Sequence, residues 1–307
     1  MERALVHLLT LKDCSSKEIK ELIDSSLEIK KNPEDYEFAL EGKSLAMIFQ
    51  KTSTRTRLSF EVGMTQLGGH AIYMDWVTTN LVLADLRDET RSISGFVDGI
   101  MARLLKNSDL RVMAEASRVP VINGCDEKYH PSEVIGDLVT VKEKLGRLKG
   151  LKLAYIGVHN NVCNSLIVGC TKAGVRIVTV TPVVNEASFD EELMEAAKTT
   201  GLYEHSLDVK AAVQDSDVVY TDTWVDMEFF LNPQFRKEKE KRVKTMLPYQ
   251  VNRKLLGDSD ALIMHDMPIH RGYEIADDMV ESPNSVIYSQ SENRLYSAKA
   301  ILLKLLG

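Results

Sequence analysis

The sequence predicts an α/β fold with a parallel β-sheet and about two domains, and three observations support this. A length of 307 residues is that of two domains of ordinary size. An apolar run at residues 44–49 precedes a polar loop and an amphipathic run at residues 58–67, which is the pattern of strand, loop and helix. Apolar runs at residues 151–157 and 175–180 enclose a helical segment at residues 161–173, and this spacing predicts a βαβ unit.

The first half of the chain alternates helices and strands. Ser15 and Glu18 form the capping pattern of a helix whose apolar stripe begins at Ile19. The helix at residues 58–67 stops at a glycine pair, which is a common C-terminal signal. The remaining elements expected here are strands at residues 70–74, 99–102 and 120–124 and helices at residues 92–96, 109–117 and 134–144.

The second half begins after a junction at residues 146–150. The turn of the βαβ unit lacks the G-x-G-x-x-G spacing, so it is not the usual dinucleotide fingerprint. A leucine stripe predicts a final helix at residues 292–306. The other elements expected are helices at residues 189–199, 206–214 and 236–244, a helix beginning at residues 248–252, and strands at residues 217–221, 261–264 and 287–288.

Composition limits the partners of the protein. The formal net charge of −7 argues against nucleic acid or an anionic membrane, although a local basic pocket for a small phosphate remains compatible with it. Residues 1–7 show no signal-peptide pattern, and no uncharged apolar run approaches the ~20 residues of a membrane span. The four cysteines lack metal-type spacing, so we expect reduced thiols in a cytoplasmic protein without a bound metal.

The loop at residues 50–57 carries the strongest functional signal. Its sequence includes Ser53, Thr54, Arg55, Thr56 and Arg57, immediately where a helix begins. A helix N-terminus presents unpaired N–H groups and a partial positive charge, and arginines add forked donors that match phosphate oxygens. We therefore expect an anion site here, the alternative being a capped helix start with two solvated arginines.

This loop resembles the phosphate-binding signature of the aspartate/ornithine carbamoyltransferases. Other segments similar to that family follow in the family's order: residues 67–71, 97–103, 119–124, 129–131, 160–162, 220–224, 249–252 and 292–295. The resemblance covers nearly the whole chain and is closest to the ornithine branch.

The resemblance implies two domains that bind different substrates, each an open parallel sheet flanked by helices. Residues 1–147 would bind carbamoyl phosphate, completed by a C-terminal helix at residues 290–307 that returns to the first domain. Residues 148–289 would bind the amine acceptor. The implied reaction is attack of a neutral amine on the carbonyl carbon with loss of phosphate, without a metal, cofactor or covalent nucleophile.

Matching positions give the residues expected to act. Those implied as catalytic are Arg55, Arg103, His130 and Asp266. Those implied to bind carbamoyl phosphate are Ser53, Thr54, Arg55, Thr56, Arg103, His130, Glu133 and Arg294. Those implied to bind the acceptor are Asn160, Asn161, Asp222, Asp226, Met227, Asp266 and Met267.

The chain departs from the family pattern at several of these positions. Glu133 stands where relatives have glutamine, so it would accept a hydrogen bond from the carbamoyl amide, or it turns away or pairs with an arginine. Asp266 replaces a cysteine and would orient or deprotonate the amine, unless it caps a helix or turn. Asp226 and Glu228 add acids that favour a cationic acceptor such as a diamine.

The segment at residues 76–87 is the least family-like part. Relatives have a glycine-containing loop that reaches a neighbouring subunit, whereas this segment has neither glycine nor lysine. Thr79, Asn80 and Arg87 are the available substitutes, and an apolar subunit contact is the favoured alternative. The resemblance also implies a homotrimer or a higher homo-oligomer.

Three functions remain open from sequence. The first is carbamoyl transfer to ornithine or a related amino acid or diamine, as in arginine biosynthesis. The second is a non-catalytic or regulatory paralogue that keeps the phosphate pocket. The third is a transferase that uses a different acyl phosphate, a possibility that the departure at Glu133 also raises.

Overall fold

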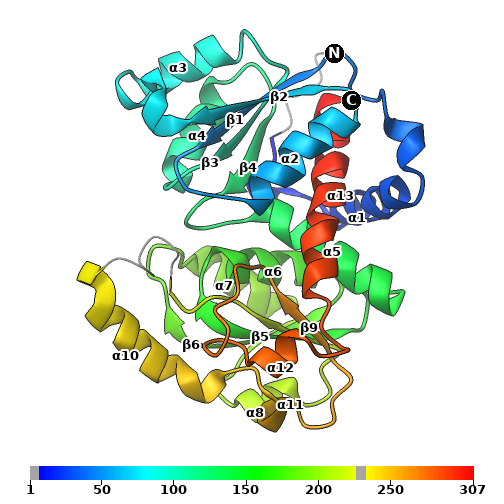
Figure 1. Cartoon of the computed structure of the whole chain (residues 1–307), viewed down its shortest axis with the longest axis vertical. Helices are drawn as coiled ribbons and strands as arrows, with labels where there is room; N and C mark the ends of the chain where they lie inside the picture. The colour runs from blue at the N-terminus through cyan, green and yellow to red at the C-terminus, as the bar shows by residue number, and fades with distance from the viewer. Residues whose placement is uncertain (1–6, 226–232) are drawn as a thin grey trace. The chain divides into compact units, whose positions relative to one another are not determined.

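The computed structural model describes residues 7–225 and 233–307. The chain forms two compact units (Figure 1). The first unit contains the chain up to Val139 together with Glu292–Gly307, and the second contains Thr140–Ser291. No helix in the described ranges is both long enough and apolar enough to cross a membrane.

In the described part of the first unit, four parallel strands form one sheet in the order β2-β1-β3-β4. They are β1 Ser44–Phe49, β2 His70–Asp75, β3 Gly99–Arg103 and β4 Val121–Cys125. Strands β1, β3 and β4 are buried almost throughout, as expected for a parallel sheet covered on both faces, whereas the edge strand β2 is largely exposed. The chain therefore reverses its direction of winding between β1 and β3.

The helices of the first unit supply the crossovers that parallel strands require. They are α1 Ser16–Lys31, α2 Arg55–Gln66, α3 Leu86–Ile93 and α4 Asn107–Ala116, with 3-10 turns at η1 Leu11–Asp13, η2 Pro33–Tyr36, η3 Trp76–Thr78 and η4 Asn80–Val82. A core that includes Ala46, Ile48, Ile100 and Leu110 packs the sheet against α3 and α4.

The second unit contains, in its described residues, a five-stranded parallel sheet in the order β7-β6-β5-β8-β9. Its strands are β5 Lys152–His159, β6 Arg176–Val184, β7 Tyr203–His205, β8 Val218–Thr221 and β9 Leu262–His265. Its helices are α6 Asn161–Ala173, α7 Glu191–Thr199, α8 Val209–Val213, α10 Arg236–Met246, α11 Arg253–Leu256 and α12 Asp277–Val280, with 3-10 turns η5 Pro233–Phe235 and η6 Leu247–Tyr249. The winding direction reverses between β5 and β8.

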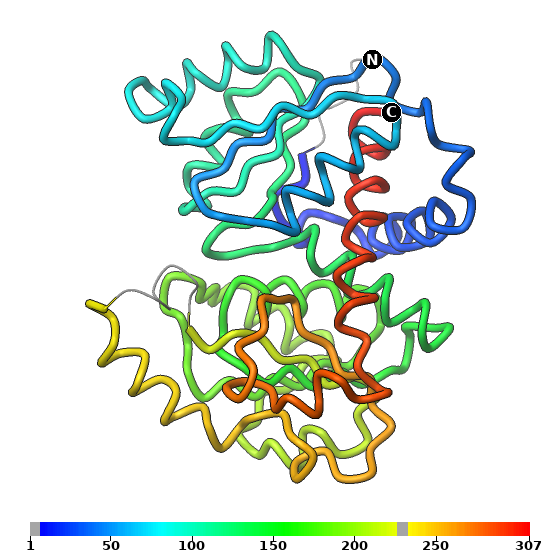
Figure 2. The backbone as a smooth tube through the Cα atoms, viewed as in Figure 1, coloured from blue at the N-terminus to red at the C-terminus, as the bar shows by residue number. Residues whose placement is uncertain are grey.

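Two helices belong to both units. They are α5 Pro131–Leu145 and α13 Ile287–Leu306. The end of α13 lies beside α1, where Lys304 is 3.8 Å from Glu18, and Lys30 donates to Asn293 at 2.8 Å (Figure 2). The α/β class, the two parallel sheets and the return of the C-terminal helix to the first unit are all confirmed.

Several local predictions were wrong. Ile287 and Tyr288 were expected in a strand because of their β-propensity, but they form the first turn of α13, where helix packing prevails over propensity. The helix expected at residues 92–96 is α3, which begins earlier because Asp85 accepts from the Arg87 amide and caps it.

The remaining errors concern short elements, including the three-residue strand β7, which was not predicted. The helix expected at residues 206–214 is limited to α8, and residues 247–249 form the 3-10 turn η6 before Asn252 caps α11. The four-residue helix α12 was not predicted, since so short an element leaves no periodic signal.

Candidate active site

The loop after β1 leads directly into the N-terminus of α2. Thr54 precedes the helix in a helical conformation, and no side chain in the described residues caps this end. Helix N-termini leave N–H groups unpaired, so the first turn of α2 keeps its capacity to bind an anion. Ser53 and Arg55 are half-buried here, Thr54 is exposed and Thr56 is buried.

Arg57 does not join this anion site. Its Nε donates to Glu61 at 2.8 Å, and its guanidinium lies 3.9 Å from the centre of the Tyr73 ring on β2. The expectation that both arginines of the loop face a phosphate was therefore wrong. The sequence could not show this, because the aromatic ring that holds Arg57 comes from the edge strand.

The loops after β1 and β3 are joined at the reversal point of the first sheet. The Leu105 amide donates to Gln50 Oε1 at 2.8 Å, and the Gln50 amide donates to the Arg103 carbonyl at 2.9 Å. Arg103 ends β3, and its Nε is buried with no hydrogen-bond partner among the described residues. A guanidinium with a buried, unused Nε donor at the carboxyl end of a parallel sheet is suited to an anionic ligand.

A network of buried polar side chains continues from Arg103. Its Nη1 lies 3.5 Å from His130 Nε2, and that nitrogen lies 3.1 Å from Glu133 Oε2. The same carboxylate oxygen is 2.9 Å from Arg294 Nη2, which also donates to Thr56 Oγ1 at 2.7 Å. His130, Glu133 and Arg294 are 4%, 1% and 5% exposed. Residues from α2, β3, α5 and α13 thus meet in one cluster.

This network fixes the protonation of His130. Burial, followed by the charges of Arg294 and Arg103, holds the pKa of His130 well below 6.5. The ring is therefore neutral at pH 7, and its Nε2 lies 3.1 Å from a carboxylate oxygen of Glu133, which can only accept. His130 consequently carries its proton on Nε2. The expectation that Glu133 pairs with an arginine is confirmed by its contact with Arg294.

The second group of predicted residues lies at the reversal point of the second sheet. Asn160 follows β5 and caps α6 by accepting from the amides of Val162 and Cys163. Its Nδ2 donates to Asp222 Oδ2 at 2.6 Å, immediately after β8. Asn161 is the first residue of α6, and Asp266 and Met267 follow β9. All these positions are at the carboxyl ends of adjacent parallel strands, where open α/β sheets bind ligands.

Asp222 and Asp266 form a carboxyl pair. Asp222 is 2% exposed and shares a side-chain hydrogen bond with Asp266, whose side chain is 14% exposed. Burial, and after it the charge of Asp266, raises the pKa of Asp222 well above its usual value. Both causes favour the neutral form of the Asp222 carboxyl group.

His265 and Glu274 support the turn that carries Asp266. His265 Nε2 is 2.9 Å from Glu274 Oε1, and the His265 amide donates to Gln290 Oε1 at 2.9 Å. The same Gln290 donates to Tyr220 Oη on β8 at 3.1 Å. Sequence analysis missed Glu274 and Gln290, and no short-range pattern connects either of them to His265.

The pKa of His265 and the hydrogen bonds to its ring indicate different protonation states. Burial lowers its pKa, but hydrogen bonds to Asp266 and Glu274 raise it to about 10, which describes a charged ring. The Met267 amide, however, lies 2.8 Å from Nδ1 as a donor. A ring N–H and an amide N–H would repel at that distance, so we assign a neutral ring with its proton on Nε2, donated to Glu274.

The remaining predicted residues have less direct placements. Asp226 and Met227 lie outside the described residues, as does Glu228. In the segment at residues 76–87, Thr79 donates to the Trp76 carbonyl at 2.9 Å and Arg87 lies 4.0 Å from Glu115, so both have local partners. No group of three or more His, Cys, Asp or Glu side chains in residues 7–225 and 233–307 could hold a metal ion.

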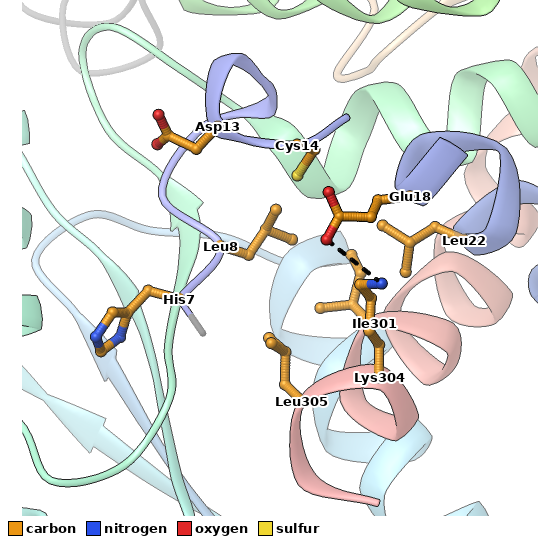
Figure 3. Close-up of a pocket in the computed structure, with 9 residues that line it drawn as sticks. All are labelled: His7, Leu8, Asp13, Cys14, Glu18, Leu22, Ile301, Lys304 and Leu305. Carbon is orange, nitrogen blue, oxygen red and sulfur yellow. Dashed lines mark ion pairs between the residues drawn. The ribbon is translucent and has the colours of Figure 1, made fainter. Parts of the chain in front are cut away.

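A separate hollow on the first unit contains none of the predicted residues. Leu8, Leu22 and Ile301 contribute its apolar walls, and the Glu18–Lys304 ion pair crosses it (Figure 3). It lies where the N-terminal segment, α1 and α13 meet, away from the carboxyl ends of the strands. The predicted residues that the structure describes instead gather at the reversal points of the two sheets.

Comparison with known proteins identifies the family. The model of the aspartate/ornithine carbamoyltransferase carbamoyl-P binding domain matches residues 6–143, and that of the Asp/Orn binding domain matches residues 149–305. The chain belongs to the aspartate/ornithine carbamoyltransferase family. Arg294 is covered by the second family model but belongs to the first structural unit, because α13 returns there.

Ornithine carbamoyltransferases are among the proteins similar to this chain. That of Methanosarcina mazei is 40% identical over 308 residues, covering 97% of this chain and 98% of its own length. That of Pyrococcus horikoshii is 44% identical over 276 residues, covering 87% and 84%. The solved structure of the Pyrococcus furiosus enzyme matches with a TM-score of 0.90 and 40% identity over 98% of this chain and 97% of that one.

Proposed function

We propose that the protein transfers the carbamoyl group of carbamoyl phosphate to the side-chain amine of ornithine and releases phosphate. The observation that carries this is the cluster in the first unit. The open N-terminus of α2, the half-buried Arg103 and the neutral His130 lie in the segment that matches a carbamoyl-P binding domain, and the buried Arg294 joins them from α13. The relatives named ornithine carbamoyltransferase support the choice of acceptor.

The cluster suggests a role for each donor-site residue. We propose that Ser53, Thr54, Arg55 and Thr56 hold the phosphate at the N-terminus of α2. Arg103, with its buried unused Nε, and His130, with its Nε2 proton, would hold the carbonyl oxygen. Arg294 would complete the phosphate site, and Glu133 would accept from the carbamoyl amide.

The reaction follows from this arrangement. The lone pair of the neutral amine attacks the carbonyl carbon, and the carbonyl oxygen takes up negative charge facing Arg103 and His130. Collapse of this intermediate breaks the bond between the carbonyl carbon and the phosphate oxygen, and the surplus proton of the amine leaves with the phosphate. Holding two reactants in line can supply up to ~7–11 kcal/mol, and cationic donors stabilise the developing charge.

The second unit would bind the acceptor. We propose contacts from Asn160, Asn161, Asp222, Asp266 and Met267, all at the carboxyl ends of β5, β8 and β9, and from Asp226 and Met227. Asp266 would orient the amine. The domain boundaries that go with this assignment are residues 1–147 with 290–307 for the donor and residues 148–289 for the acceptor. We also expect a cytoplasmic protein without nucleic-acid or membrane partners.

The decisive experiment is release of phosphate from carbamoyl phosphate with a panel of acceptors. The panel holds ornithine, N-acylated ornithines, lysine, putrescine, agmatine and aspartate. We expect the wild-type protein to release phosphate with ornithine as acceptor. Arg103→Ala should lose this activity. The control Arg118→Ala, at an exposed arginine, should keep it. Turnover with a diamine alone would reassign the acceptor.

A specific observation favours a second candidate function. Glu133 contacts the donor nitrogens of both His130 and Arg294, which carbamoyl phosphate would need for its carbonyl oxygen and its phosphate. If carbamoyl phosphate binds but no acceptor is carbamoylated, the protein is a regulatory paralogue. If another acyl phosphate turns over instead, the donor is the part of the proposal that fails.

We propose that the protein forms a homotrimer or a higher homo-oligomer through the exposed edge of the first sheet. Strand β2 is an edge strand, and exposed apolar side chains gather on it and on the turns that follow: Ile72, Tyr73, Val77, Val82 and Leu83. Such side chains on a sheet edge favour association. Light scattering after gel filtration should give a trimer, which Leu83→Glu dissociates and the control Phe38→Glu, at another exposed apolar residue, does not.

A further inference from the structure

We propose that a second hollow on the first unit binds a free hydrophobic α-amino acid, with the carboxylate of the ligand at Lys299 and its ammonium group at Glu34 or Glu37. This hollow, termed the α2–α13 hollow, is lined by side chains from three segments, at residues 33–38, 65–68 and 295–299. The segments contain the turn η2, the end of α2 and one face of α13. The inference does not depend on the proposed carbamoyl transfer.

The α2–α13 hollow has the size of a small-molecule site. Its volume is about 630 Å³, within the ~300–1,000 Å³ of typical ligand pockets. All three segments that line it belong to the first unit. The proposed phosphate site is at the N-terminus of α2, whereas the hollow is at the other end of this 12-residue helix, roughly 16 Å along its axis. The two sites therefore have no lining residue in common.

Lys299 gives the hollow a buried cation without an anionic partner. The residue is 2% exposed, and its stem packs against α2, which lies beside α13 (Figure 1): a Cβ added to Gly63 would lie 3.6 Å from Lys299 Cγ. The ammonium group lies 5.8 Å from the centre of the Tyr296 ring and makes no hydrogen bond or ion pair with any residue that the structure describes. Burial lowers the pKa of Lys299, because the charged form loses hydration that nothing replaces. An anionic group of a ligand would supply the missing partner.

A second lysine near the hollow already has its partners. Lys30 Nζ lies 5.3 Å from the centre of the same Tyr296 ring. It donates to Asn293 at 2.8 Å, however, and lies 3.8 Å from Glu292. Lys299 is therefore the cation available to a ligand here. One ammonium group suits a singly charged carboxylate better than a phosphate, which arginine clusters and helix N-termini bind.

Two acidic side chains in the hollow require a positive group on the ligand as well. Glu34 and Glu37 are exposed, and neither forms an ion pair with another residue in the described ranges. Their carboxylates repel a ligand that carries only negative charge and attract an ammonium group. A zwitterion satisfies both requirements, since its carboxylate faces Lys299 and its ammonium group faces the glutamates. Free α-amino acids are small zwitterions of this kind.

Apolar side chains in the hollow define the rest of the ligand. Pro33, Phe38 and Leu295 line it together with Tyr296. Phe38 is 72% exposed, so an apolar group that covers it would remove apolar surface from water. A ligand side chain that is aliphatic or aromatic gains this contact, whereas a charged side chain does not. The buried cation, the acidic side chains and the apolar wall together describe a hydrophobic α-amino acid.

Calorimetric titration of the full-length protein tests this site with two series of probes. One series is L-phenylalanine, 3-phenylpropanoate and 2-phenylethylamine, and the other is L-leucine, 4-methylpentanoate and 3-methylbutylamine. In each series the second compound lacks the amine and the third lacks the carboxylate. We expect the amino acid of at least one series to bind once per chain, and its two analogues to bind at least ~10-fold more weakly. Inorganic phosphate with L-norvaline, which should occupy the proposed transfer site, should leave the Kd unchanged.

Variants assign the binding to the charged side chains. Lys299→Met keeps the length of the stem and removes the charge, so the Kd of the amino acid should rise at least ~10-fold. Its thermal stability should equal or exceed that of wild type, because an unpartnered buried ammonium is removed, whereas loss of a purely structural lysine would lower it. Lys304→Met, on the same helix, is the control and should keep the wild-type Kd, because its partners Glu18 and Glu21 lie outside the hollow.

The acidic side chains are tested with the double variant Glu34→Gln and Glu37→Gln. This protein should bind the amino acid more weakly and the analogue without an amine more tightly, since the negative charge that repels a carboxylate is gone. An equal loss for both compounds would contradict a direct contact between the glutamates and an ammonium group.

Several outcomes would overturn this inference and leave the proposed function intact. They are no binding of either amino acid up to ~10 mM, an unchanged Kd in Lys299→Met, and binding that phosphate with norvaline abolishes. A change of oligomeric mass in Phe38→Glu would make the hollow an interface between copies of the chain instead of an amino-acid site. Amino-acid binding that persists in Arg103→Ala, at the proposed transfer site, would support a separate site.

Discussion

At the scale of single residues, Glu133 is the most informative departure from its relatives. One carboxylate oxygen accepts from His130 at 3.1 Å and pairs with Arg294 at 2.9 Å. Both partners are groups that the proposed reaction would use on the donor. A buried carboxylate that pairs with them neutralises part of the positive charge available to a phosphate.

The first prediction is that Glu133→Gln binds carbamoyl phosphate more tightly. Removing one negative charge next to Arg294 frees the guanidinium for the ligand, so we expect the Kd to fall about tenfold. Calorimetric titration of carbamoyl phosphate measures this. Glu115→Gln, at an exposed acid of α4, is the control and should leave the Kd unchanged. Weaker binding by Glu133→Gln would mean instead that the carboxylate itself contacts the donor.

The second prediction concerns stability and pH at Asp222. Its pKa is raised in the folded protein, so the native state keeps a proton that the unfolded chain loses above pH ~4. The unfolded state then binds fewer protons, and stability falls as pH rises from ~4 toward the raised pKa. Asparagine at position 222 keeps the shape and the donor to Asp266 without the proton.

Asp222→Asn should therefore match wild type near pH 5 and exceed it at pH 9, by about 1–3 kcal/mol. Urea denaturation at the two pH values measures the difference. Asp258→Asn, at an exposed aspartate, serves as the control. Asp217 is unsuitable as a control, because its carboxylate accepts a hydrogen bond from the Lys152 amide. An equal effect at both pH values would show that Asp222 does not hold the proton.

At the scale of elements, the close approach of α5 and α13 builds the donor site. A Cβ added to Gly136 on α5 would lie 3.3 Å from Ser297 Oγ and 3.5 Å from the Cα of Arg294. Glycine lets the two helices come close enough for Arg294 to reach Glu133, whereas Ser297 also donates to the Ser132 carbonyl at 3.3 Å. The position of Arg294 thus depends on a residue that contacts no ligand.

The third prediction is that Gly136→Val impairs both stability and donor binding. Its branched side chain would press on α13 at Arg294, so we expect a loss of about 1–3 kcal/mol and a weaker Kd for carbamoyl phosphate. Gly63→Ala is the control, because its Cβ would meet α13 only at ordinary distances, 3.5 Å from Leu302. Unfolding curves and titrations measure both effects. An unchanged Kd in a folded Gly136→Val protein would contradict the coupling.

Sequence alone predicted the central elements well. Strands β1, β3 and β5 are continuous apolar runs, and their burial in parallel sheets explains why the pattern was clear. Element ends were less predictable, as α3 and the start of α13 show, because caps and packing decide them. Of the residues named from motifs, Arg103 and His130 are neighbours, and Thr56 is connected to them through Arg294 and Glu133. The side-chain direction of Arg57 and the joining of Asp222 to Asp266 depend on strands far apart in the sequence.

At the scale of the whole molecule, each unit presents polar residues at the reversal point of its own parallel sheet. The first unit gathers cationic donors, and the second gathers carboxyl and amide groups. With a net charge of −7, the protein as a whole does not attract anions, so the local cluster of arginines must do so. Binding of each ligand should therefore stabilise mainly the unit that holds its site.

The fourth prediction is that carbamoyl phosphate protects the first unit most strongly. At 100 times its Kd, binding should stabilise the folded protein by about 2.7 kcal/mol. Hydrogen exchange should slow most in the loop after β1 and at the start of α5, and least at the edge strand β7 of the second unit. Arg103→Ala should abolish the protection. Protection confined to the second unit would contradict the assignment of the donor.

The return of α13 to the first unit also has a consequence in time. Arg294 follows Val139 by 155 residues, and all but two of the residues between them belong to the second unit. At about 5–20 residues per second, a ribosome needs roughly 8–30 s to make that stretch. During this interval Thr56 and Glu133 have been synthesised, but Arg294, which contacts both of them in the folded protein, has not. The unit that is synthesised first is therefore the one that is completed last.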